Sequence, residues 1–202
     1  MTRSLVPSGS ISPPQELTKF FDDPPLVGTE QRSEYDAFFA TIARAERPVD
    51  AIDWLLLKDL VDIAWEIRRE RRIKSEIIKI KQIEVISDLL KSTYDKTDRL
   101  GSALNRIFDA GAEAQLWASN SEARERINNK LAEKGYKPES VLAHAYLRGA
   151  GDIDAIERRI ASYEARRNLI LKEINLRSER TAQRLDKASS NIIDAEFSEA
   201  AE

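Results

Sequence analysis

The stretch from Asp50 to Ser92 contains neither glycine nor proline, and it constrains the fold more than any other. As a single helix it spans about 65 Å. A long helix with one apolar stripe is rarely stable alone in water, so the stripe must be buried against another element. With one gap, its apolar residues recur at steps of three or four: Ile52, Leu56, Leu60, Ile63, Ile67, Ile73, Ile77, Ile80, Ile83 and Ile86 or Leu90.

A second stretch, residues 152–187, carries a matching heptad pattern in which arginine replaces two apolar residues. The positions are Ile153, Ile156, Ile160, Tyr163, Arg167, Ile170, Ile174, Arg177 and Thr181. Between the two stretches, glycine and proline break residues 93–151 into shorter pieces. The sequence therefore predicts an all-α fold, a long antiparallel helical hairpin or coiled coil with a small helical insert at its tip.

The gap in the first stripe falls at Glu70. If the hairpin places Ser92 near Asp152, then Glu70 faces Ile174 and Arg177. The charges of Glu70 and Arg177 would then interrupt the two apolar seams at matching positions. Each charge would be poorly solvated without the other. We therefore predict a structural ion pair between Glu70 and Arg177.

Local signals divide the insert. Ser119 resembles the first residue of a capping box for a helix that Gly135 ends. A short helix over residues 139–148 follows, and Gly149 is expected to end it together with Gly151. The second long helix would then start at Asp152.

The two ends of the chain differ from the middle. Residues 1–28 hold five of the seven prolines and predict a flexible N-terminal arm, whose last part, residues 20–28, is apolar enough to dock on the helices. Residues 29–187 form the predicted helical domain, which opens with a helix over about residues 30–46. Residues 188–202 are small, polar and acidic, and predict a disordered tail.

Composition excludes several classes of protein. The chain has no cysteine, so disulfides and thiolate metal sites are excluded and a reducing compartment is compatible. No run of eighteen uncharged apolar residues is present to span a membrane. We expect a cytoplasmic protein that does not bind membranes.

Carboxylates and the single histidine give little support for catalysis. Asp59, Asp62 and Glu66 share one helical face and could bind a divalent cation with a ligand from a second helix, but Arg69 is placed to pair with Glu66. We interpret His144, the single histidine, as a surface or helix-capping residue. Because no phosphate loop, metal motif or nucleophile turn is present, we predict no catalytic, cofactor-binding or metal-binding residue, and no enzyme.

The net charge is −3, yet basic residues cluster in the first long stretch. Candidate contacts to nucleic-acid phosphates are Arg68, Arg69, Arg71, Arg72 and Lys74. Glutamates are interleaved with them, which is typical of a salt-bridged coiled coil. A nucleic-acid-binding accessory protein, with the acidic tail competing for this basic belt, therefore stays as the alternative function.

The leading hypothesis comes from apolar residues outside the hairpin seam. A two-helix hairpin covers one stripe on each helix, and Trp54 and Trp65 are the largest residues left over. Others are Leu57, Val61, Ile78, Val85, Leu169, Leu171 and Leu176. The first helix can cover some of them and a second copy the rest. We predict a non-enzymatic interaction or scaffold protein that forms homo-oligomers, most simply a dimer. In it Trp54 and Trp65 are either core residues or interface anchors.

Three stretches resemble a family of short, uncharacterised helical proteins common in alphaproteobacteria. They are residues 24–30 (PPLVGTE) followed by Tyr35, residues 59–72 (DLVDIAWEIRRERR) and residues 156–174 (IERRIASYEARRNLILKEI). The resemblance covers about a third of the chain in the same order. It implies that the two long helices form the common body of the family, and it transfers no activity.

Overall fold

The computed structural model describes the backbone of residues 13–93 and 100–199, and the side chains of residues 13–93 and 108–190. Within these residues every regular element is helical, which confirms the all-α prediction. A 3₁₀ turn, Gln15–Leu17, precedes the helices α1 (Thr18–Phe21), α2 (Arg32–Glu46), α3 (Ala51–Thr93), α4 (Leu100–Ser119), α5 (Ser121–Ala132) and α6 (Pro138–Glu199).

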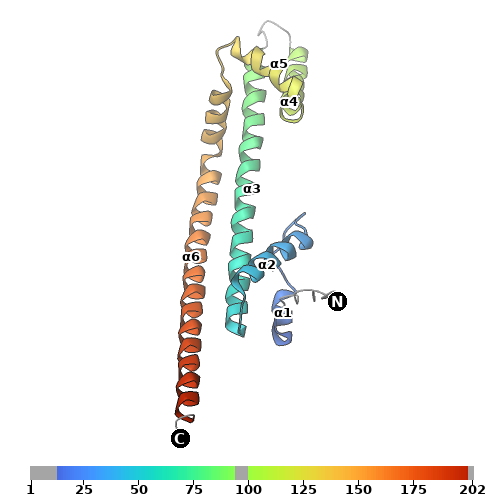
Figure 1. The fold of residues 1–202 in the computed structure, drawn as a ribbon. Helices are drawn as coiled ribbons and strands as arrows, with labels where there is room; N and C mark the ends of the chain where they lie inside the picture. Colours follow the sequence, from blue (N-terminus) through green and yellow to red (C-terminus); the bar gives the residue numbers. More distant parts are fainter. Residues whose placement is uncertain (1–12, 94–99, 200–202) are drawn as a thin grey trace, which may run out of the picture. The chain divides into compact units, whose positions relative to one another are not determined.

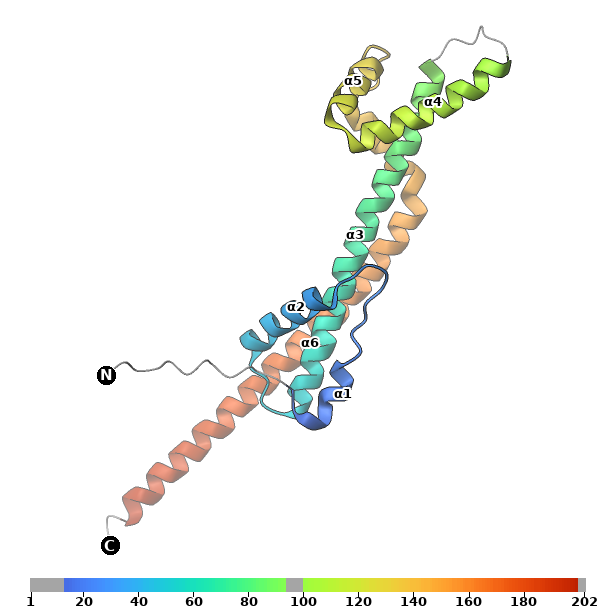
Figure 2. The ribbon, with the colours of Figure 1, turned by 90° about the vertical axis from the view of Figure 1, so that its right-hand side faces the viewer.

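The chain divides into two compact units, and both long helices pass through both of them. Unit 1 comprises residues 1–68 and 161–202, and unit 2 comprises residues 69–160. In each unit α6 lies beside α3 and runs in the opposite direction (Figures 1 and 2). The predicted antiparallel pairing of two long helices is therefore confirmed.

An aromatic core holds α2 and the preceding segment onto α3 in unit 1. Tyr35 of α2 is buried against Trp65, and Phe21 of α1 contacts Trp54 edge to face. Leu26 packs against the same cluster. Phe21 and Leu26 of the predicted arm therefore pack on the helices, whereas Phe20 and Val27 of the same stretch are exposed. Residues 1–12 of that arm lie outside the described residues.

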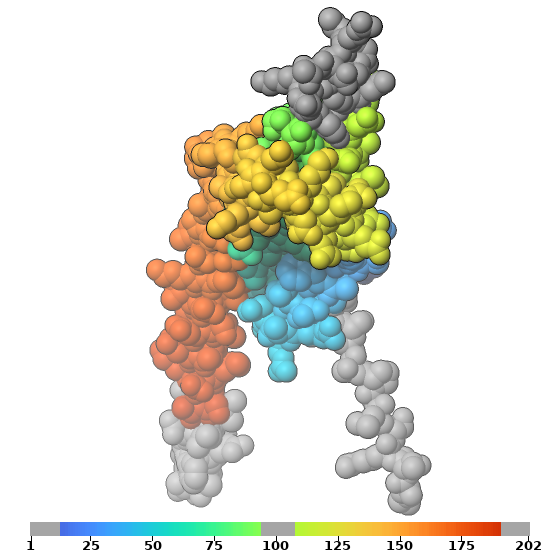
Figure 3. All heavy atoms as spheres, turned by 90° about the horizontal axis from the view of Figure 1, so that it is seen from above, coloured from blue at the N-terminus to red at the C-terminus, as the bar shows by residue number. Residues whose placement is uncertain are grey.

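Helices α4 and α5 cover the end of α3 in unit 2. Val85, Ile86 and Leu90 of α3 form one apolar cluster with Ala110 and Ala114 of α4, Ile127 and Leu131 of α5, and Val141 and Ala145 of α6. In the space-filling view, α4 and α5 lie side by side over this end of α3 (Figure 3). Small alanines on α4 allow the helices to approach closely.

The second long helix begins earlier than predicted. Helix α6 starts at Pro138 and continues through Gly149 and Gly151, where the sequence predicts a break. A glycine inside a helix costs about 1 kcal/mol relative to alanine. At Gly149 a Cβ atom would lie 3.3 Å from Ile153 Cδ1 and 3.5 Å from Lys81 Cγ of α3. The contacts with α3 would be ordinary van der Waals contacts, and the tighter one is with the end of a side chain on α6 itself. Gly149 therefore packs beside α3 within a continuous helix.

The early start of α6 changes the register of the hairpin, and the predicted Glu70–Arg177 pair is wrong. Glu70 accepts two hydrogen bonds from Arg159, at 2.7 and 2.9 Å. Arg177 instead contacts Asp50 and Asp53. The prediction assumed that the returning helix begins at Asp152. Because it begins at Pro138, the partner of Glu70 lies about five helical turns closer to the start of α6.

Two further boundaries differ from the predictions. The side chain of Asn120, rather than that of Ser119, caps α5 by accepting a hydrogen bond from the amide of Ala123 at 2.8 Å. The predicted stop at Gly135 is confirmed, with φ at +86° and its amide bonded to Ala132 O. At the other end, α6 extends to Glu199, so the predicted end at residue 187 is wrong, and residues 200–202 lie outside the described part.

Candidate functional site

The basic residues proposed as nucleic-acid contacts are mostly engaged within the chain. Arg68 donates to Glu34 at 3.1 Å and lies over the ring of Trp65, with 4.9 Å between the guanidinium carbon and the ring centroid. Lys74 pairs with Glu157 of α6. Arg69 and Arg71 also have interaction partners, and Arg72 is exposed. This arrangement is that of salt-bridged packed helices.

The carboxylates considered as metal ligands do not converge. Asp62 accepts a hydrogen bond from the Tyr35 hydroxyl and pairs with the buried Lys58. Burial and this hydrogen bond to Asp62 raise the pKa of Tyr35. Asp59 is exposed. Among the described residues, no group of three or more side chains is arranged to hold a metal ion.

The two tryptophans predicted as interface anchors lie in the core of unit 1. Trp54 is 4% exposed and Trp65 is 2% exposed. Nε1 of Trp65 donates to Glu30 at 2.9 Å, which satisfies its polar group inside the chain. Of the two roles predicted for these residues, the core role holds and the interface role is wrong, because α2 and the segment before it cover both rings.

The groove that the structure offers instead lies where α2 meets α3 and both face α6; we call it the corner groove. Its volume is about 240 Å³. The corner contributes Glu46, Arg47, Pro48, Val49, Asp53 and Leu57, and α6 contributes Ile174, Ser178, Thr181, Ala182 and Leu185. Small-molecule pockets usually exceed about 300 Å³, so a groove of this size better suits side chains of a protein partner.

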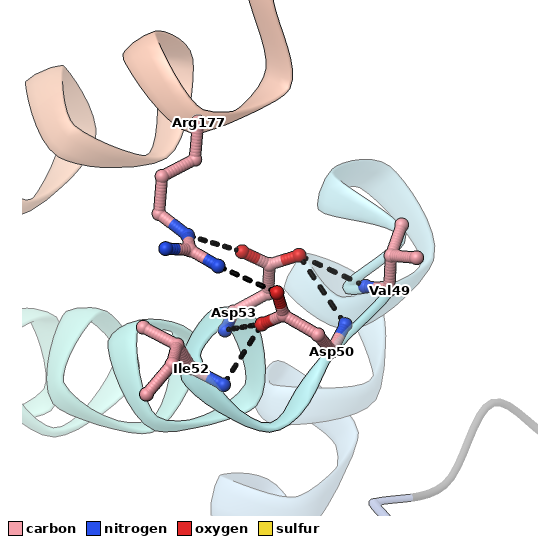
Figure 4. Close-up of polar contacts among 5 residues, drawn as sticks. All are labelled: Val49, Asp50, Ile52, Asp53 and Arg177. Atoms are coloured by element: carbon pink, nitrogen blue, oxygen red, sulfur yellow. Dashed lines mark hydrogen bonds and ion pairs between the residues drawn. The ribbon is translucent and has the colours of Figure 1, made fainter. Parts of the chain in front are cut away.

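A polar clamp fixes α6 to the corner beside this groove (Figure 4). Asp50 caps α3 by accepting hydrogen bonds from the amides of Ile52 and Asp53, both at 2.9 Å. Arg177 donates to Asp53 at 2.7 Å and to Asp50 at 2.6 Å. Asp53 in turn accepts from the amide of Val49 at 3.1 Å.

Electrostatics keep the clamp charged. Burial raises the pKa of Asp53, but the hydrogen bonds from Arg177 and from the amides of Val49 and Asp50 outweigh it and hold this pKa below its usual range. Hydrogen bonding to Asp53 raises the pKa of Arg177. Both groups therefore stay ionised near neutral pH, and the position of α6 against the corner is fixed.

Beyond the clamp, α6 continues as a helix without cover from its own chain. Every side chain from residue 178 to residue 190 is exposed. Figure 1 shows this part of α6 extending past the first turn of α3. Leu185 is 65% exposed and Val49, across the groove, is 78% exposed. Leu185 is the one large apolar residue of this exposed part, and it lines the corner groove. A helix without tertiary packing gains stability when a partner covers it.

Sequence reasoning missed the corner groove for a clear reason. The predicted register pairs Arg177 with Glu70 and so leaves no arginine for the start of α3. Asp50 and Asp53 could have pointed to the correct partner, because carboxylates at the start of a helix attract a cation.

No described helix combines the length and apolar character needed to cross a membrane. Comparison of the chain with family models, with curated proteins and with solved structures gave no match. The resemblance to the alphaproteobacterial family therefore stays a prediction, and the function must be argued from the corner groove and from the exposed part of α6.

Proposed function

We propose that this protein is a non-enzymatic helical interaction protein that self-associates through α6. The supporting observation is the long, uncovered part of α6 beyond Arg177, next to an apolar groove. Single helices gain most of their stability from tertiary packing, so this part of α6 is expected to gain order and stability from a partner. The described carboxylates and basic residues, in contrast, are largely used in ion pairs inside the chain.

Sedimentation equilibrium of the full chain tests this proposal. We expect the weight-average mass to rise with protein concentration toward that of a dimer. Leu185→Asp is expected to weaken association by at least about tenfold, because a carboxylate would be buried in an apolar contact. A wild-type protein that stays monomeric at every concentration would overturn the proposal.

Leu169→Asp provides the matched control. Leu169 and Leu185 are 68% and 65% exposed on the same helix, so both substitutions should cost the folded monomer equally little. Only Leu185 lines the corner groove. Equal weakening by both variants would show that association depends on exposed leucines in general, not on the groove.

A further inference from the structure

The corner groove is lined by both apolar and charged side chains, and two arginines that the clamp does not use lie beside it. Next to it, Arg180 and Arg184 line a small polar depression together with Asp50, Arg177 and Thr181. Arg177 is committed to the clamp. Within the part of the chain that the structure describes, Arg180 and Arg184 form no ion pair, and both are exposed. This chemistry suits a partner helix that has apolar residues on one face and acidic residues beside them.

The chain itself contains such a segment. Residues 188–202 carry Asp194, Glu196, Glu199 and Glu202 and no basic residue, and their large apolar residues are Ile192, Ile193 and Phe197. The segment belongs to α6 as far as Glu199. Because it continues the same helix that forms one wall of the groove, it cannot fold back onto residues 174–185 of its own chain. A groove of this chain can receive it only from another copy.

We infer, on the basis of the proposed function, that residues 188–199 of a second copy occupy the corner groove, with the two α6 helices antiparallel. A two-fold axis near Ala188 then places the acidic segment of each copy on Arg180 and Arg184 of the other. The overlap from Ile174 to Glu199 is about 39 Å of helix at 1.5 Å per residue. Each copy supplies one groove and one acidic segment, so the assembly closes as a dimer.

Charge decides the direction of this pairing. In a parallel arrangement, Arg180 and Arg184 of the two copies would face each other, and so would the acidic segments. Like charges placed together oppose association, whereas the antiparallel arrangement brings opposite charges together at both ends. The same attraction makes the dimer sensitive to salt, because exposed ion pairs are screened.

A charge exchange between two full-length variants tests the inference. The first variant carries Arg180→Glu and Arg184→Glu, and the second carries Asp194→Lys and Glu196→Lys. Each alone brings like charges together at both ends of the dimer and is expected to associate at least about tenfold more weakly than wild type. An equal mixture restores both attractions, so we expect a heterodimer within about threefold of wild-type affinity.

Circular dichroism of each variant checks that helix content is unchanged, and sedimentation measures the association. If the wild type self-associates and either variant does so equally well, the second copy binds elsewhere and the inference is wrong, while the proposed function stands. Failure of the mixture to restore association also overturns the inference, because another segment must then fill the groove. A monomeric wild type removes the proposed function and the inference together.

Discussion

Replacing Trp65 with alanine is expected to lower the free energy of unfolding by about 3–5 kcal/mol. The indole is buried, meets the ring of Tyr35 edge to face at a centroid distance of 5.5 Å, and packs beside Phe38 at 6.4 Å. Alanine would leave a cavity among these rings and remove the donor to Glu30. Urea denaturation followed by circular dichroism measures the change.

Trp65→Phe separates the two contributions. Phenylalanine keeps most of the aromatic packing but loses the hydrogen bond to Glu30, so a smaller loss of about 1–2 kcal/mol is expected. Neither variant should weaken self-association where it remains folded, because Trp65 is not exposed to a partner. A loss below about 1 kcal/mol for the alanine variant would contradict the placement of Trp65 in the core.

Arg159→Ala is expected to cost about 2 kcal/mol of unfolding free energy, a large effect for an arginine that is half exposed. The reason lies in its partner. Glu70 is 7% exposed, and both of its carboxylate oxygens accept hydrogen bonds from Arg159. Without Arg159 a desolvated carboxylate remains between α3 and α6. The neighbouring Arg158→Ala is the control, and it should cost less than about 0.5 kcal/mol because Arg158 is exposed.

The register also predicts which pair of charges is energetically coupled, because Glu70 is bonded to Arg159 and Arg177 is bonded to Asp50 and Asp53. A double-mutant cycle with Glu70→Gln should give coupling between Glu70 and Arg159 and none between Glu70 and Arg177. The reverse result would contradict the register.

The spacing of apolar residues and the residues that begin a helix were sufficient to predict the first long helix. The stretch 50–92 corresponds closely to α3, Ala51–Thr93, because an apolar stripe with a single gap and an aspartate cap are local signals. The same holds for α2, predicted over about residues 30–46 and observed as Arg32–Glu46, and for Gly135, whose left-handed conformation favours glycine. Each of these features depends on residues within a few turns of one another.

Features that depend on long-range packing could not be predicted in the same way. Gly149 and Gly151 are ordinary helix terminators by local preference, yet α6 continues through both of them, with Gly149 packed beside Lys81 and Ile77 of α3. The wrong register of α6 against α3 has the same cause, because the predicted break moved the start of the second long helix from Pro138 to Asp152. Whether Trp54 and Trp65 face a second protein or α2 depends equally on a tertiary contact, since both arrangements require the same aromatic residues on α3.

The corner groove also lies beyond local patterns. Its walls come from the turn after α2, from the start of α3 and from α6, so its existence depends on the register. The chemistry of its rim was nevertheless visible in the sequence, because Arg180 and Arg184 precede an acidic segment on the same stretch. Charge segregation along this stretch predicts a disordered tail beside a basic belt, whereas a continuous helix is compatible with the self-complementary surface that we propose.

Hydrogen–deuterium exchange at several protein concentrations tests most directly whether the protein self-associates through the part of α6 beyond Arg177. We predict that amide exchange in residues 178–190 is fast in dilute protein and slows as concentration rises, because a second copy then covers this segment. Exchange in residues 58–67, which are packed within one chain and do not line the corner groove, should stay unchanged. Exchange in residues 178–190 that is independent of concentration, while sedimentation shows a dimer forming, would contradict this.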